Sequence, residues 1–78
     1  MREKELRLLL TFDTTEAAIA TEAMCARLGL PGRLIPVPRA ITANCGMAWS
    51  APKDSEADIL SAAEHNGVRI AEVYYMIL

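Results

Sequence analysis

The sequence predicts an α+β domain of the ferredoxin-like, split βαβ type, with a four-stranded antiparallel sheet and two helices on one face. Hydrophobic residues alternate with a period of two and then recur at helical spacing, and the periods follow one another in the order βαββαβ. Each helical segment ends at a glycine that precedes a strand-like segment. The 78 residues suffice for one domain, which we expect to span 1–78.

The first strand and helix have the most regular patterns. Apolar residues occupy every second position from Leu6 to Phe12, which is typical of a half-buried strand. Asp13, with Glu16 three residues later, predicts a capping box at the start of an alanine-rich helix over 14–28. One face of that helix is expected to carry Ala17, Ala20, Met24 and Leu28.

The second strand is expected over 33–37. Its pairing is limited by Pro36 and Pro38, because proline has no N–H to donate to a ladder. The remaining elements are expected in this order: a loop over 38–44, a strand over 47–51, a turn and helix cap over 52–55, a helix to about residue 65, and a strand from 69 to about 76.

Composition excludes several classes of partner. The formal net charge of −2 leaves no basic excess for a nucleic acid, and no apolar run approaches the roughly 20 residues that cross a bilayer. The charged start 1–5 does not resemble a signal peptide, so we expect a cytoplasmic protein with two free thiols. His65 is the only histidine and there is no CxxC, so neither a metal nor another cofactor is expected.

Other functions of this fold need loop residues that the chain lacks. A copper chaperone would need a CxxC, and an acylphosphatase an arginine, in the connection 12–16, which contains neither. An RNA-recognition domain would need more aromatic residues on its central strands than Phe12, Trp49, Tyr74 and Tyr75 supply.

The loop that leads to Cys45 has the strongest chemical signal. Prolines, including Pro38, stiffen its entrance, and we expect Pro38, Asn44 and Gly46 to support the loop or bind substrate. Gly46 leaves space for a second molecule and turns its own N–H toward a sulfur anion. Arg39 would lower the thiol pKa by stabilising the thiolate, so Cys45 and Arg39 are the candidate catalytic residues.

A structural interpretation stands beside this one. Cysteine is often a small core residue, and Arg39 could be a solvated loop charge. Cys25, inside the alanine-rich helix, is expected to be a packing residue. If Cys45 were also structural, the chain would be a non-enzymatic small-ligand-binding or protein-interaction module. The apolar segment 73–78 predicts a dimer or larger assembly, with a homodimer as one form, and an apolar patch on the open sheet face would favour sheet-to-sheet dimerisation.

Three short motifs are shared with a known family: Thr11-Phe12, Pro36-Val37-Pro38-Arg39 and Cys45-Gly46. With them the chain resembles the selenium/sulfur carrier protein-like family over nearly its whole length. It differs from that family's usual residues at Ala40, where an acidic residue is common, and at Thr42-Ala43-Asn44, where small hydroxyl residues are usual.

The resemblance implies that Cys45 carries sulfur or selenium as a persulfide or perselenide. The partners would then be a donor protein and an acceptor protein. A carrier of a covalently bound atom is favoured over a turnover enzyme, because one cysteine suffices for relay whereas a dithiol oxidoreductase needs a resolving cysteine nearby.

Overall fold

Within the residues that the structure describes, four strands and two helices follow one another in the order βαββαβ, with one short 3-10 turn before the second helix. The computed structural model describes residues 4–41 and 45–78. The elements are β1 (Leu6–Thr11), α1 (Thr15–Leu28), β2 (Arg33–Pro36), β3 (Met47–Pro52), the 3-10 turn η1 (Lys53–Ser55), α2 (Glu56–His65) and β4 (Glu72–Ile77).

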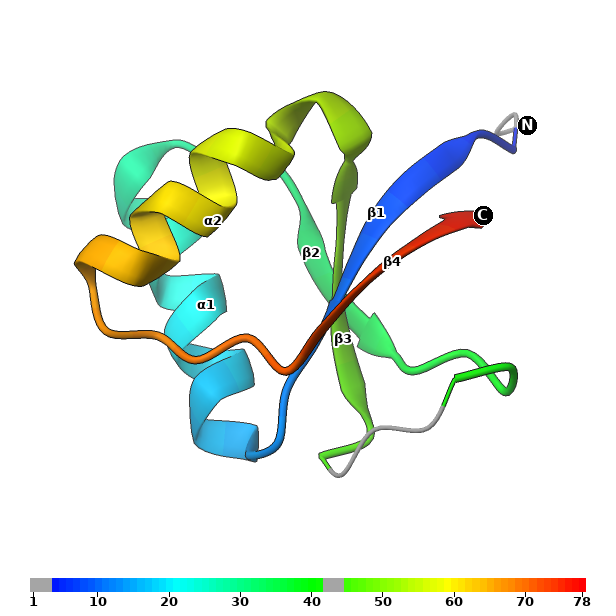
Figure 1. Cartoon of the computed structure of the whole chain (residues 1–78), viewed down its shortest axis with the longest axis horizontal. Helices are drawn as coiled ribbons and strands as arrows, with labels where there is room; N and C mark the ends of the chain where they lie inside the picture. Colours follow the sequence, from blue (N-terminus) through cyan, green and yellow to red (C-terminus); the bar gives the residue numbers. More distant parts are fainter. Residues whose placement is uncertain (1–3, 42–44) are drawn as a thin grey trace.

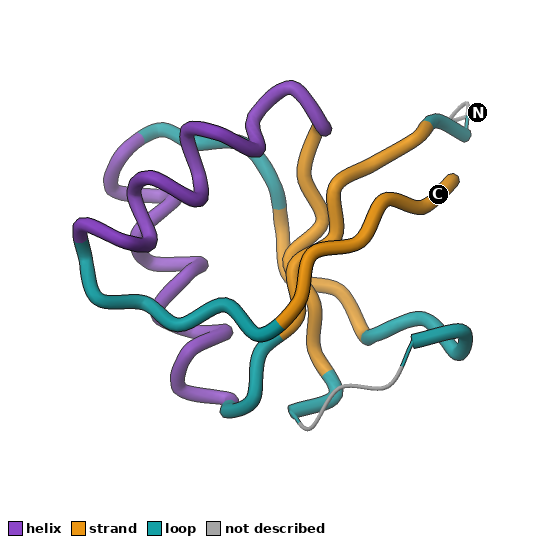
Figure 2. Tube along the Cα trace, in the orientation of Figure 1, coloured by secondary structure: helices purple, strands orange, loops and turns teal. Residues whose placement is uncertain are grey.

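The strands form one antiparallel sheet in the order β2-β3-β1-β4. Leu10 lies at its centre, opposite Trp49 of β3 and Val73 of β4. Both helices lie on the same side of this sheet (Figures 1 and 2). The predicted ferredoxin-like fold class is therefore confirmed.

The main hydrophobic core fills the space between the sheet and the helices. β1 contributes every second residue to it, as its period of two predicted. Cys25 is fully buried there, in keeping with the packing role expected from the sequence. Its other large members are Leu8, Leu10, Phe12, Met24, Trp49 and Ile59.

The amino end of α1 differs from the predicted capping box at Asp13. Thr14 is the N-cap: it has extended backbone angles, and its Oγ1 accepts the N–H of Ala17 at 3.1 Å. A residue in the extended region can aim its side chain at the free N–H groups of the first turn, and Thr14 occupies that position one residue beyond Asp13.

The buried face of α1 is also offset from the expected one. Of the four residues predicted to share the buried face, Met24 is buried, whereas Ala20 and Leu28 are exposed. The buried positions are Ala18, Thr21, Met24 and Cys25. Packing against β3 and α2 selects this face, and the alanine-rich sequence alone leaves the choice nearly open.

The last strand begins at Glu72, later than the expected residue 69. Val68 and Gly67 donate their N–H groups to carbonyls of α2, so the chain is still closing the helix at these residues. It reaches the sheet at Ala71, whose N–H donates to the carbonyl of Thr11 at 2.9 Å. The segment between α2 and β4 thus crosses from the helix layer to the sheet.

Replacing Thr14 with alanine should lower the free energy of unfolding by about 1 kcal/mol, because the side-chain cap of Ala17 is lost. Urea denaturation followed by circular dichroism measures the change. Thr15→Ala is the matched control, since Thr15 is also exposed but lies inside the helix and caps nothing in the described structure. Equal losses in the two variants would contradict the cap.

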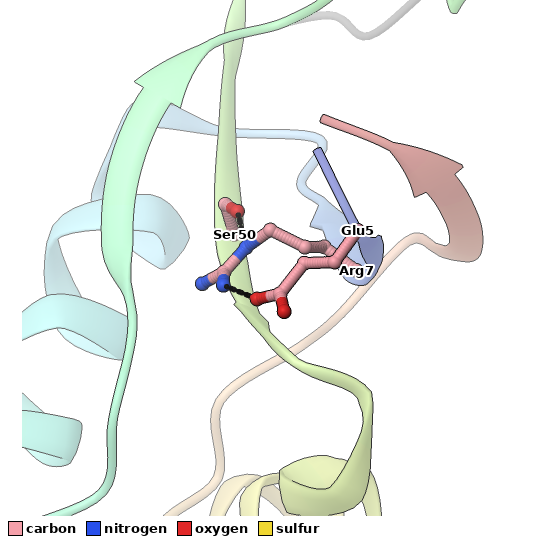
Figure 3. Close-up of polar contacts among 3 residues, drawn as sticks. All are labelled: Glu5, Arg7 and Ser50. Atoms are coloured by element: carbon pink, nitrogen blue, oxygen red, sulfur yellow. Dashed lines mark hydrogen bonds and ion pairs between the residues drawn. The ribbon is translucent and has the colours of Figure 1, made fainter. Parts of the chain in front are cut away.

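The face of the sheet away from the helices is partly covered by its own side chains. Arg7 lies along this face (Figure 3), where its Nε donates to Ser50 Oγ and its Nη1 to Glu5 Oε1, both at 2.9 Å. Leu9 and Ala48 are fully buried beside it. This second cluster also includes Ile35, Val37, Ile41, Tyr74, Met76 and Leu78.

Candidate functional site

Cys45 directly precedes the Gly46 turn that leads into β3. Met47 pairs with Pro36 of β2, and one step further the N–H of Val37 donates to the carbonyl of Gly46 at 3.0 Å. The β2–β3 ladder therefore continues to the two ends of the loop 38–45. The described residues of this loop, 38–41 and 45, lie at the end of the sheet where β1 runs into α1 (Figure 1).

The sulfur of Cys45 contacts the backbone two residues ahead of it. Its Sγ lies 3.4 Å from the Met47 nitrogen, which donates to it, and 3.4 Å from the Met47 carbonyl oxygen, to which the thiol donates. The side chain is half-buried and packs on the edge of the main core.

Gly46 makes this contact possible, although not in the expected way. Its φ of 73° turns the chain so that the next N–H points back at the preceding side chain. The N–H that reaches the sulfur thus belongs to Met47, whereas the sequence suggested that of Gly46. Gly46 is exposed, and a Cβ there would meet no described atom within 4 Å apart from those of its two chain neighbours.

Pro38 and Arg39 belong to a tight turn at the start of the loop. The N–H of Ile41 donates to the carbonyl of Pro38 at 3.0 Å, which closes a four-residue turn. Arg39 occupies its second position, is exposed, and makes no hydrogen bond or ion pair with any residue of 4–41 or 45–78. A contact between Arg39 and Cys45 therefore stays a prediction, and Asn44 lies outside the described residues.

Ile41 has a role that the sequence analysis missed. It is 9% exposed and packs against Leu9 and Ala48 on the sheet face away from the helices. Cys45 packs on the opposite face, with the main core. Ile41 thus packs on one face of the sheet and Cys45 on the other. Ile41 is the only large apolar residue in the expected 38–44 loop, and its isolation among small and polar residues was the sequence signal that could have revealed this role.

The described residues contain neither a metal site nor a ligand pocket. Within 4–41 and 45–78, no three histidine, cysteine or acidic residues come together as a metal site, and no pocket is found. No helix in the same ranges has the length and apolar character needed to span a membrane.

Fold and site together define a class of protein: a small ferredoxin-like α+β domain in which the half-buried thiol of Cys45 lies at the base of a hairpin loop. A family model described as "Putative Se/S carrier protein-like" matches residues 7–75, and the chain belongs to this family. The match includes Cys45, Gly46 and the Pro36-to-Arg39 segment. No curated protein and no solved structure is significantly similar to the chain.

Proposed function

We propose that the protein carries a sulfur or selenium atom on Cys45 as a persulfide or perselenide and passes it from a donor protein to an acceptor protein. One observation supports the proposal most: in a chain of the Se/S carrier-like family, the half-buried Cys45 sulfur lies 3.4 Å from the Met47 nitrogen at the end of the loop. The Met47 N–H contact fixes the position of the sulfur, the atom that would attack a donor persulfide.

The loading step is a thiolate displacement. The Cys45 thiolate attacks the outer sulfur of a donor persulfide, so that a new S–S bond forms on Cys45 while the donor's S–S bond breaks. The donor cysteine leaves as a thiolate, and the proton of the donor persulfide stays on the transferred sulfur. Unloading is the same exchange, with the acceptor's thiolate as the attacking group. No net oxidation occurs in either direction.

The residues around the thiol would have separate parts in this exchange. Gly46 would leave the approach to the sulfur open on its own side, since it has no side chain. Arg39, at the exposed turn, would attract the anionic sulfur of the donor and stabilise the thiolate as the loop meets a partner. Pro38 restricts the turn that presents Arg39, and Asn44 is the neighbouring polar candidate for substrate contact.

A relay with one cysteine fits the distribution of thiols. Cys25 is the only other cysteine, and it is fully buried in the main core. It is therefore not placed to resolve a mixed disulfide on Cys45 without opening α1. Because the carrier needs a free thiol, we assign it to a reducing compartment, the cytoplasm.

Incubation with a low-molecular-weight persulfide, followed by removal of the reagent and intact mass spectrometry, tests the proposal. The wild-type chain should gain the mass of one sulfur atom, and the gain should disappear on reduction with dithiothreitol. Cys45→Ser should gain nothing, whereas Cys25→Ala, the matched control, should load like the wild type. Arg39→Ala should load more slowly and keep the wild-type circular dichroism spectrum.

Two results would overturn the carrier function. The first is a sulfur adduct that persists in Cys45→Ser, which would place the reaction elsewhere. The second is no adduct on the folded wild-type chain while the unfolded chain loads, which would make Cys45 a packing residue. In that case the chain would be an interaction domain with an incidental thiol.

A further inference from the structure

The two edges of the sheet are built differently. β2 at one edge has only four residues, ends at Pro36 and is followed by Pro38, and prolines blunt an edge because they offer no N–H. β4 at the other edge has six residues, no proline and a single charged residue, Glu72. Lysine, proline and short length are the usual devices that prevent strand pairing, and β4 has none of them.

The hydrogen-bond pattern identifies which β4 groups face outward. Glu5 and Leu78 donate to each other's carbonyls, both at 3.0 Å, so they form a hydrogen-bonded pair of the antiparallel ladder. Such pairs alternate with non-hydrogen-bonded pairs, and the register runs without interruption from Leu6↔Ile77 to Thr11↔Glu72. The N–H and C=O groups that point away from β1 are therefore those of Val73, Tyr75 and Ile77.

The side chains of the same residues form an apolar strip. Val73, Tyr75 and Ile77 are 37%, 50% and 60% exposed, and Leu6, opposite Ile77, is also exposed. They lie on the helix side of the sheet, where the Tyr75 hydroxyl donates to a carboxylate oxygen of Glu56 at the start of α2. This strip, defined by the three β4 residues, combines uncovered apolar surface with unpaired backbone groups.

We propose that β4 pairs with β4 of a second copy of this chain, antiparallel and across a two-fold axis at Tyr75. Tyr75 then faces Tyr75 of the other copy in a hydrogen-bonded pair, and Val73 of each copy faces Ile77 of the other. Every outward N–H and C=O of the strip gains a partner, and the two sheets become one continuous sheet.

A second copy of the chain fits the free edge of β4 because the strip is self-complementary. In this register the strip places apolar residues against apolar residues on the helix side, and on the other face Tyr74 meets Met76. Glu72, the single charge, lies at one end of β4, so the two-fold axis sends the two carboxylates to opposite ends of the paired strands. No like charges meet, and like charges directly opposite would destabilise such a pair.

The dimer does not cover Cys45 in either copy. Cys45 lies beside β2 and β3, and the sheet order β2-β3-β1-β4 places β2 at the edge opposite to β4. Each copy therefore keeps its loop free, and pairing through β4 requires no change at the carrier site. The proposal stands or falls independently of the proposed function.

Light scattering of the full chain at increasing concentration measures the association. We expect a mass of twice 8.5 kDa for the wild type. The dimer dissociation constant should rise by at least about tenfold in Ile77→Lys, because a lysine at an edge opposes pairing. Ile19→Lys is the matched control: Ile19 is 55% exposed, on α1, and its replacement should leave the dimer intact.

Cross-linking tests the register. In a Cys45→Ser background, Tyr75→Cys should form a disulfide-linked dimer on mild oxidation, because hydrogen-bonded partners lie about 5.5 Å apart between Cα atoms. Val73→Cys should not, since the two copies of Val73 would be separated by about 13 Å along the strand. A monomer mass at every concentration, equal effects of the two lysine variants, or equal cross-linking of the two cysteine variants would overturn the proposal.

Discussion

Cys45 should be alkylated by iodoacetamide at least about 1,000-fold faster than Cys25 in the folded protein, as expected if α1 opens at a cost of about 4 kcal/mol or more. Cys25 is fully buried in the main core, and burial raises the pKa of its thiol, which lowers the thiolate fraction at neutral pH. Cys45 is half-buried, and Gly46 beside it has no side chain. We therefore expect iodoacetamide to reach Cys45 without any opening of the fold.

Peptide mapping by mass spectrometry after timed labelling gives both rates from the wild-type chain. Denaturing concentrations of urea provide the control, because unfolding exposes both thiols and their rates should converge. Comparable rates in the folded protein would show that Cys45 is as protected as Cys25. That result would also remove the basis for a carrier site at Cys45.

Gly32→Ala should lower the free energy of unfolding by about 3 kcal/mol or more. A Cβ at this position would lie 2.4 Å from Trp49 Nε1 and 2.8 Å from the carbonyl oxygen of Ser50. Trp49 is buried in the main core, and Ser50 pairs with Leu9 in the ladder between β1 and β3, so neither can move without disturbing the sheet. The φ of 134° at Gly32 adds strain for any residue with a Cβ.

Urea denaturation measures this loss, and the fluorescence of Trp49, the only tryptophan, reports the local displacement. Gly29→Ala is the matched control. Gly29 also has a positive φ, but a Cβ there would meet no described atom within 4 Å, so only the backbone strain of about 1 kcal/mol is expected. Equal losses at the two glycines would show that the contact with Trp49 is not what restricts position 32.

The position of the loop that leads to Cys45 could be predicted, but its detailed contacts could not. Prolines before the loop and Cys45-Gly46 after it marked the segment, because both residue types restrict or permit particular backbone angles whatever surrounds them. The Met47 N–H on the sulfur and the burial of Ile41 depend on how the loop meets the sheet. Arg39 remains a predicted partner of the thiol, since a long exposed side chain has no position that its sequence neighbours determine.

The sequence by itself determined the order of the elements and the fold class. Alternation along β1 and the glycine stops after the two helices are local signals, and each works within a few residues of chain. Only the tertiary structure decided which face of α1 is buried and which groups of β4 are left at a free edge. These features depend on contacts between segments that are distant in sequence, and no local pattern encodes the position of a partner that the chain meets only when it folds.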